Sequence, residues 1–201
     1  MAATWKHPTL GTFTFDTMGW TKIVSVPAFK AFSYDTGYDN APRSTGKHAL
    51  VFIAPWGENT EPSAADVALA DRVLANQAAL VDVVAHALWE DFNDRGPNSG
   101  MWWHGNLNAV AKSWKALKLP PPAEARDLLP ALQVMRIIVR GGFPTFPVDP
   151  IVELCFHAAF EEEHGVGLLT DGESILGAGY YLDVMPYDYT YKSPVPPRFF
   201  G

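Results

Sequence analysis

Hydrophobic and polar residues alternate along much of this chain, which is the pattern of half-buried β-strands. Residues 12–15 show this alternation in its shortest form. Pro27 and Pro55 each mark the end of an apolar run, because proline has no N–H to donate to a sheet ladder. The pattern predicts a loose lead-in at 1–9 and strands at 12–15, 20–26, 29–34, 50–53, 132–140 and 151–160.

A helical period replaces the alternation over residues 64–93 and gives them one broad apolar face. Ser63 is a candidate N-cap, and Asp66 three residues later takes the place of the usual Glu or Gln of a capping box. One helix of this length is unusual in a small domain, so a break near Asn76 fits the pattern as well as a continuous helix does. We also expect a short helix over 106–117 and a helical turn at 123–130.

Asp171-Gly172 is the strongest local signal, because two apolar runs flanking Asp-Gly favour a two-residue hairpin turn. That turn would place Thr170 opposite Glu173 and Leu168 opposite Ile175. In this register small residues gather into a patch, which either admits a ligand or a backbone, packs under a helix, or marks a β-bulge. The patch consists of Gly165, Gly167, Gly177, Ala178 and Gly179.

These elements predict a single α+β domain over residues 1–201. A mostly antiparallel sheet is expected to carry the helices of 64–93 and 106–117 on one face. The last residues, 185–201, are rich in proline and tyrosine, and their prolines exclude a central strand beyond Lys192.

Composition narrows the function classes. The chain has 201 residues, 48% of them hydrophobic and 18% charged, which is typical of a globular protein rather than a disordered one. Its formal charge of -7 disfavours nucleic acid and an anionic membrane and suits a basic protein partner. The single cysteine, the absence of a signal-peptide pattern and the absence of a long apolar run predict a cytoplasmic location. No cofactor is expected, and the sequence does not indicate an oligomeric state.

Strand 151–160 has an apolar face, expected to lie under the helices, and a polar face. Arg136 and Arg140 share one face of the preceding strand, so the polar face is interpreted as a solvated one with ion pairs. The alternative is a metal or acid/base cluster, although its spacing matches no ligand signature. The candidate ligands are Cys155, His157, Glu161 and His164.

The acidic corner Glu161-Glu162-Glu163-His164-Gly165 is the better candidate site. Three successive carboxylates repel one another, so one of them needs a raised pKa or a cationic partner. Histidine is the side chain best suited to acid–base chemistry at neutral pH, so His164 and the adjacent Glu163 are the candidate catalytic residues. The alternative is that acids gather at an exposed strand end simply to remain hydrated.

Trp102 and Trp103 offer an aromatic platform for a sugar, a base or a protein, unless at least one of them belongs to the core. His48, His86 and His104 are isolated in the sequence and are interpreted as structural.

The order of several motifs supports a resemblance. Val24-Ser-Val-Pro-Ala-Phe29 precedes the helical segment, Leu154-Cys-Phe follows it, and Glu162-Glu-His-Gly-Val-Gly-Leu168 and Gly177-Ala-Gly complete the series. The chain resembles uncharacterised bacterial proteins of a domain-of-unknown-function family that share a Glu-His-Gly-(Leu or Val)-Gly motif before a short hairpin. The resemblance implies a stand-alone cytosolic protein, similar to small immunity or accessory proteins encoded near toxin systems, and implies no catalytic residue. Members often have Trp-Asp or a similar pair before Glu-His-Gly, where this chain has Phe160-Glu161-Glu162.

Two functional hypotheses follow. The first is a non-enzymatic, immunity-like module that binds a protein through Trp102, Trp103, the acidic corner 161–165 and Gly167. The second is a small hydrolase or metal-dependent enzyme that uses Glu163 and His164, with His157 as a further candidate. A third interpretation gives the motif a structural role and places the function elsewhere.

Overall fold

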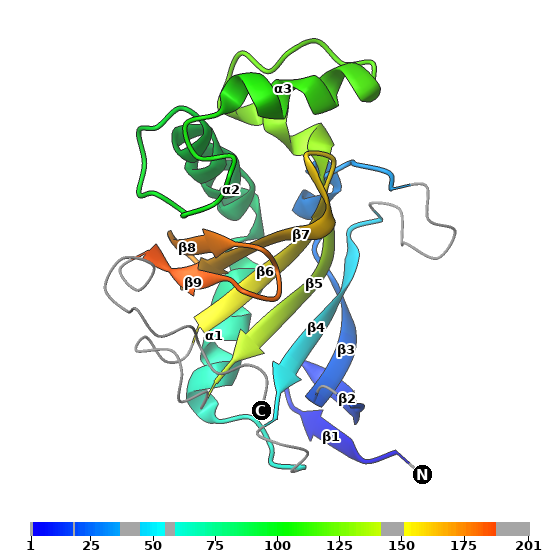
Figure 1. Cartoon of the computed structure of the whole chain (residues 1–201). Helices are drawn as coiled ribbons and strands as arrows, with labels where there is room; N and C mark the ends of the chain where they lie inside the picture. Colours follow the sequence, from blue (N-terminus) through cyan, green and yellow to red (C-terminus); the bar gives the residue numbers. More distant parts are fainter. Residues whose placement is uncertain (1, 18, 37–44, 55–58, 142–150, 188–201) are drawn as a thin grey trace.

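The computed structural model describes residues 2–17, 19–36, 45–54, 59–141 and 151–187. Over these residues the chain forms one sheet whose strands lie side by side in sequence order (Figure 1). Neighbouring strands are antiparallel except β4 and β5, which are parallel. The strands are β1 (Thr4–His7), β2 (Gly11–Phe15), β3 (Gly19–Ser25), β4 (Lys47–Ile53), β5 (Leu132–Arg140), β6 (Ile151–Ala158), β7 (Glu161–Thr170), β8 (Ile175–Gly179) and β9 (Met185–Pro186).

The parallel pair β4–β5 explains where the helices lie. Parallel neighbours need a long crossover connection, and the chain between them carries α1 (Ala64–Ala75), α2 (Gln77–Phe92), α3 (Leu107–Ala116) and the 3₁₀ helix η3 (Ala125–Ala131). In Figure 1, α1 and α2 cover one face of the sheet and α3 extends this helical layer at its end. This arrangement confirms the predicted α+β class.

Local signals place the helix boundaries. Both hydrogen bonds of the predicted capping box are present, because Ser63 Oγ accepts from the Asp66 N–H and the Asp66 carboxylate accepts from the Ser63 N–H. The break near Asn76 is also confirmed, since α1 ends at Ala75 and α2 begins at Gln77. None of the helices among the described residues combines the length and the apolar character that a membrane span requires.

The main core lies between the helical layer and the sheet. The predicted apolar face of β6 contributes to this core, together with Phe13 and Phe52 from the first strands and Leu80, Val84 and Leu88 from α2. The β6 residues and Phe160, which follows them, are Val152, Leu154, Phe156, Ala158 and Phe160.

Two predicted elements near the N-terminus are wrong. The expected loose lead-in contains β1, whose Trp5 pairs with Phe13 of β2 and is buried. The expected strand at 29–34 is instead the 3₁₀ helix η1 (Pro27–Ala31), and both Phe29 within it and Phe32 just after it are buried in the core. In both places aromatic side chains, Trp5 in the first and Phe29 and Phe32 in the second, are buried in the core.

The hairpin exists, but its predicted register is wrong. Thr170 pairs with Ile175 rather than Glu173, so the turn has four residues instead of two. Asp171 Oδ1 accepts hydrogen bonds from the N–H groups of Glu173 and Ser174, at 2.9 and 2.8 Å, and thereby closes the longer turn. The Asn76 side-chain amide donates to the Gly172 carbonyl at 3.2 Å, which joins the turn to the junction of α1 and α2.

The opposite face of β6 is buried, so its interpretation as a solvated face is wrong. Glu153 and Cys155 have no exposed surface. The Glu153 carboxylate accepts from Arg140 Nε at 2.6 Å and from the Cys155 thiol at 3.2 Å. Val184, in the segment between β8 and β9, packs against Ile151 and Leu169 on this side of the sheet. The predicted C-terminal segment 185–201 begins with β9, and its residues 188–201 lie outside the described part of the chain.

Candidate functional site

The acidic corner projects from the sheet because β7 carries extra residues there. Phe156 pairs with Val166 and Ala158 pairs with Glu161, so His157 alone opposes the four residues 162–165. Such a bulge bends a strand and re-aims its side chains. Gly165 completes the bend with φ +61°, and an added Cβ would lie 2.4 Å from the Phe156 carbonyl oxygen.

Glu161 is the centre of the corner. Its side chain is only 10% exposed, and both carboxylate oxygens have partners. Oε2 accepts from the indole Nε1 of Trp102 at 2.7 Å, while Oε1 lies 3.0 Å from Nδ1 of His164. The backbone N–H of His164 also donates to Oε1, at 3.3 Å. The structure therefore brings together the loop before α3 and the acidic corner, which are far apart in the sequence.

Aromatic rings continue this contact inward. Trp103 has no exposed surface, which confirms a core role for one of the two tryptophans, whereas Trp102 is 41% exposed. The Trp103 ring lies edge-on to Phe160 and to Tyr180, at centroid distances of 5.5 and 5.8 Å. Tyr180 in turn lies 4.7 Å from the His164 ring. Burial raises the pKa of the Tyr180 phenol, and the Glu161 and Glu163 carboxylates raise it further.

The other two glutamates of the corner differ from Glu161. Glu162 accepts a hydrogen bond from the Tyr34 hydroxyl at 2.8 Å. The Glu163 side chain is 84% exposed, and its Oε1 lies 3.9 Å from Nε2 of His164. The carboxylate that orients the histidine is therefore Glu161 rather than Glu163.

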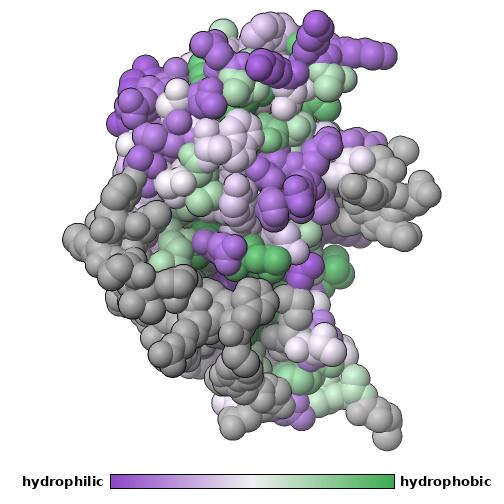
Figure 2. Space-filling model, in the orientation of Figure 1, coloured by the Kyte–Doolittle hydropathy of each residue, from purple (hydrophilic) through white to green (hydrophobic). Residues whose placement is uncertain are grey.

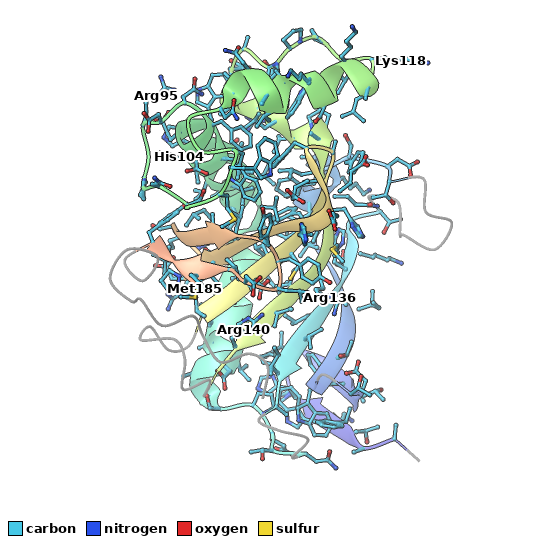
Figure 3. All side chains as sticks on the ribbon, in the orientation of Figure 1. Arg95, His104, Lys118, Arg136, Arg140 and Met185 are labelled. Atoms are coloured by element: carbon cyan, nitrogen blue, oxygen red, sulfur yellow. The ribbon has the colours of Figure 1, made fainter. Side chains whose placement is uncertain are left out.

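Cys155 and His157 do not join this cluster. The Cys155 thiol is buried beside Glu153, and burial raises its pKa well above the ordinary value. Burial lowers the pKa of His157, and the Arg136 guanidinium lowers it further. Figure 3 labels Arg136 and Arg140 along β5. Within the described ranges, no three His, Cys, Asp or Glu side chains are placed to hold a metal ion.

The predicted patch of small residues is covered by the chain itself. A Cβ on Gly167 would lie 2.9 Å from Cβ of Val184, and one on Gly177 would lie 2.1 Å from the carbonyl oxygen of Met185. Gly165 and Gly167 are both buried. For this patch, the sequence indicates a close approach by either a ligand or a backbone. The structure shows a backbone there, in the segment that leads from β8 into β9.

His104 is a residue whose surroundings sequence reasoning missed. Its Nδ1 lies 2.8 Å from Oδ1 of Asp91, and its Nε2 lies 2.8 Å from Oδ1 of Asp94. Asp91 is 1% exposed and also accepts from the Ser99 N–H at 3.2 Å. Through these contacts with Asp91 and Asp94, His104 (labelled in Figure 3) links the loop that carries Trp102 to the end of α2. A histidine about ten residues after two aspartates, beyond a glycine-rich loop, is the only signal the sequence offers for this contact.

Comparison of the chain with protein-family models, curated proteins and solved structures finds no match. The fold and the geometry of the acidic corner are thus the evidence from which a function is inferred.

Proposed function

We propose that this protein is a non-enzymatic, protein-binding module of the immunity or accessory kind. Its binding site is the corner surface, defined as Trp102, Glu161, Glu163, His164 and Tyr180. The proposal includes a bacterial, cytoplasmic setting and the relationship to the Glu-His-Gly-(Leu or Val)-Gly family that the motif suggests.

The observation that carries the proposal is the fixed, half-exposed tryptophan. The hydrogen bond from Trp102 to Glu161 holds the indole in one orientation, so little side-chain entropy is lost when a partner covers it. Tryptophan in a well-defined setting is enriched among residues that dominate binding energy at protein interfaces. A partner residue would meet one aromatic face beside carboxylates.

The charge around this tryptophan specifies the kind of partner. Glu163 is almost fully exposed and has no cation within 4 Å other than His164 among the described residues. Hydrophilic side chains gather over the upper half of the face in Figure 2, the half that contains α3 and the acidic corner in Figure 1. Together with the net charge of -7, this favours a partner with a basic surface, attracted more strongly at low salt.

The test is affinity capture of a partner from native host lysate, followed by calorimetric titration with the purified partner. Trp102→Ala is expected to weaken binding at least about tenfold, which corresponds to about 1.4 kcal/mol. Glu163→Lys is expected to weaken binding most at low salt, since it reverses an exposed charge. Glu173→Lys is the matched control, because Glu173 is an exposed glutamate in the turn after β7, at the other end of that strand. Unchanged affinity in Trp102→Ala and Glu163→Lys would contradict the proposal.

A second candidate function has one observation in its favour. Glu161 lies 3.0 Å from Nδ1 of His164, and the His164 side chain is 50% exposed, which is the arrangement of a general base oriented by a carboxylate. This arrangement supports a small hydrolase or metal-dependent enzyme in which Glu161, rather than the candidate Glu163, orients His164. Ester, phosphoester and peptide substrates, assayed with and without divalent metal, would show turnover that His164→Asn abolishes. Turnover absent, or equal in His164→Asn, would remove this candidate.

A further inference from the structure

A pocket of about 590 Å³ lies away from the corner surface, between α2, the loop after it and the start of β8. This volume falls in the range of small-molecule sites. Arg95, labelled in Figure 3, stands on the loop side of the pocket. The residues that give the pocket its character are Asp82, Val83, Ala87, Glu90, Glu173 and Tyr187.

The lining is apolar in the middle and acidic at the rim. Val83, Ala87 and Ile175 supply aliphatic surface, and three carboxylates, the Arg95 guanidinium and the His86 imidazole surround it. Two of the carboxylates are already paired, Glu90 with Arg95 at 2.8 Å and Asp82 with Arg126 at 2.5 Å.

The third carboxylate, Glu173, is different. It is exposed, and among the described residues its carboxylate has no hydrogen-bond or ion-pair partner. The turn that holds it is fixed by Asp171, which accepts from the Glu173 N–H at 2.9 Å. Glu173 is therefore a carboxylate held at the pocket rim and available to a ligand.

Asp91, near the end of α2, is the buried carboxylate that acts on the pocket residue Tyr187. Asp91 is 1% exposed, and its Oδ2 has no hydrogen-bond partner within the part of the chain that the structure describes. Tyr187, which lines the pocket, is close enough to feel this charge, since burial and then Asp91 raise the pKa of its phenol. His104 Nδ1 lies 2.8 Å from Oδ1 of Asp91, so the carboxylate left for a ligand in this pocket is Glu173.

We propose that this pocket binds a small organic cation, an ammonium or guanidinium group on a short aliphatic stem. The stem packs on Val83, Ala87 and Ile175, and the cationic head pairs with Glu173 beside the Tyr187 ring, whose face attracts a cation. Because acidic and aromatic groups surround the aliphatic surface, the pocket is expected to bind a cationic ligand more tightly than a neutral or anionic ligand of equal length. The inference is independent of the corner surface, because Glu161 begins β7 while Glu173 follows its end.

Calorimetric titration of the full-length protein with agmatine tests the proposal. Agmatine carries a guanidinium and an ammonium on a four-carbon stem, and 1,4-butanediol and succinate serve as its neutral and anionic counterparts. We expect saturable one-to-one binding of agmatine only, weakened about tenfold or more by Glu173→Gln. The exposed Glu173 carboxylate can be replaced without disturbing the core, and a thermal unfolding curve for each variant checks that the fold is retained.

Glu163→Gln is the matched control, since Glu163 is likewise an exposed glutamate and lies on the corner surface. Its agmatine affinity is expected to equal that of the unmodified protein. Absence of saturable binding at millimolar agmatine, or equal weakening by Glu163→Gln and Glu173→Gln, would overturn the proposal. Neither result would bear on partner binding by Trp102, so the two proposals fail separately.

Discussion

A single glycine lets the acidic corner leave the sheet. Gly165 has φ +61°, where a side chain is strained, and the space that its Cβ would fill is already occupied by the Phe156 carbonyl. The glycine therefore sets the direction in which His164, its neighbour, extends toward Glu161. Within the Glu-His-Gly motif, Gly165 is needed for its backbone conformation, and His164 pairs with the Glu161 carboxylate.

Gly165→Ala is expected to destabilise the protein by more than about 2 kcal/mol, because the left-handed conformation alone costs a side chain about 1–2 kcal/mol and a contact with the backbone adds to it. Gly100→Ala is the matched control, since Gly100 has φ +74° but is exposed. It is expected to cost about 1 kcal/mol. Urea denaturation of both variants measures the difference, and equal losses would show that the close approach to Phe156 carries no cost.

At the scale of elements, hydrophobic periodicity and capping residues predicted the strands and helices whose positions depend on neighbouring residues in the sequence. The alternation located most strands, and the capping box and the break at Asn76 placed both long helices, because caps and periodicity act within a few residues. The predicted hairpin register is wrong because Asp171 accepts from two N–H groups of its own turn and because Asn76, at the junction of α1 and α2, donates to the Gly172 carbonyl. The second of these contacts is long-range and leaves no local signal.

The candidate site shows the same division. The acidic corner was predicted as a cluster from its composition, and His164 is indeed paired with a carboxylate. That the carboxylate is Glu161, and that Trp102 shares it, follows from packing of the loop before α3 onto β7. No spacing in the sequence encodes a contact between residues 59 positions apart. His104 and Asp91 are only 13 positions apart, but their pairing depends on how the loop after α2 returns to the end of that helix.

The N-cap of α1 gives an element-scale prediction. Ser63→Ala is expected to cost about 1 kcal/mol of folding free energy, because the Asp66 N–H loses its acceptor and the capping box is broken. Ser63→Thr keeps a hydroxyl at the same position and is expected to cost much less. Chemical denaturation measures both, and equal losses in the two variants would mean that the hydroxyl does not stabilise the helix.

At the scale of the whole molecule, the sheet is buried on both faces around β6 and β7, and the two faces differ in chemistry. The helical face is packed with aliphatic and aromatic side chains, whereas the opposite face buries the ion pair of Arg140 and Glu153 beneath the segment between β8 and β9. Small residues are required there, because a Cβ on Gly167 would lie 3.1 Å from the Glu153 carboxylate as well as against Val184. The glycines of β7 and β8 thus make room for a buried charge and for the chain that covers it.

Removing the cation from this pair should destabilise the fold in a pH-dependent way. Burial raises the pKa of Glu153 above its ordinary value of 4.5, and Arg140 opposes that rise. In Arg140→Met the largest of the opposing effects is lost, while Cys155 and Arg136 still lower the pKa, and breaking a buried pair typically costs about 3–5 kcal/mol. A raised folded-state pKa means that the folded protein binds the proton more tightly than the unfolded chain, so the penalty is full at high pH and shrinks as pH falls through that pKa. Urea denaturation is therefore expected to show a larger loss of unfolding free energy at pH 8 than at pH 5.

The double variant Arg140→Met/Glu153→Gln has no carboxylate at position 153, so its loss of unfolding free energy is expected to be the same at both pH values. A loss in Arg140→Met that does not change with pH would show that Glu153 is not held as a buried carboxylate.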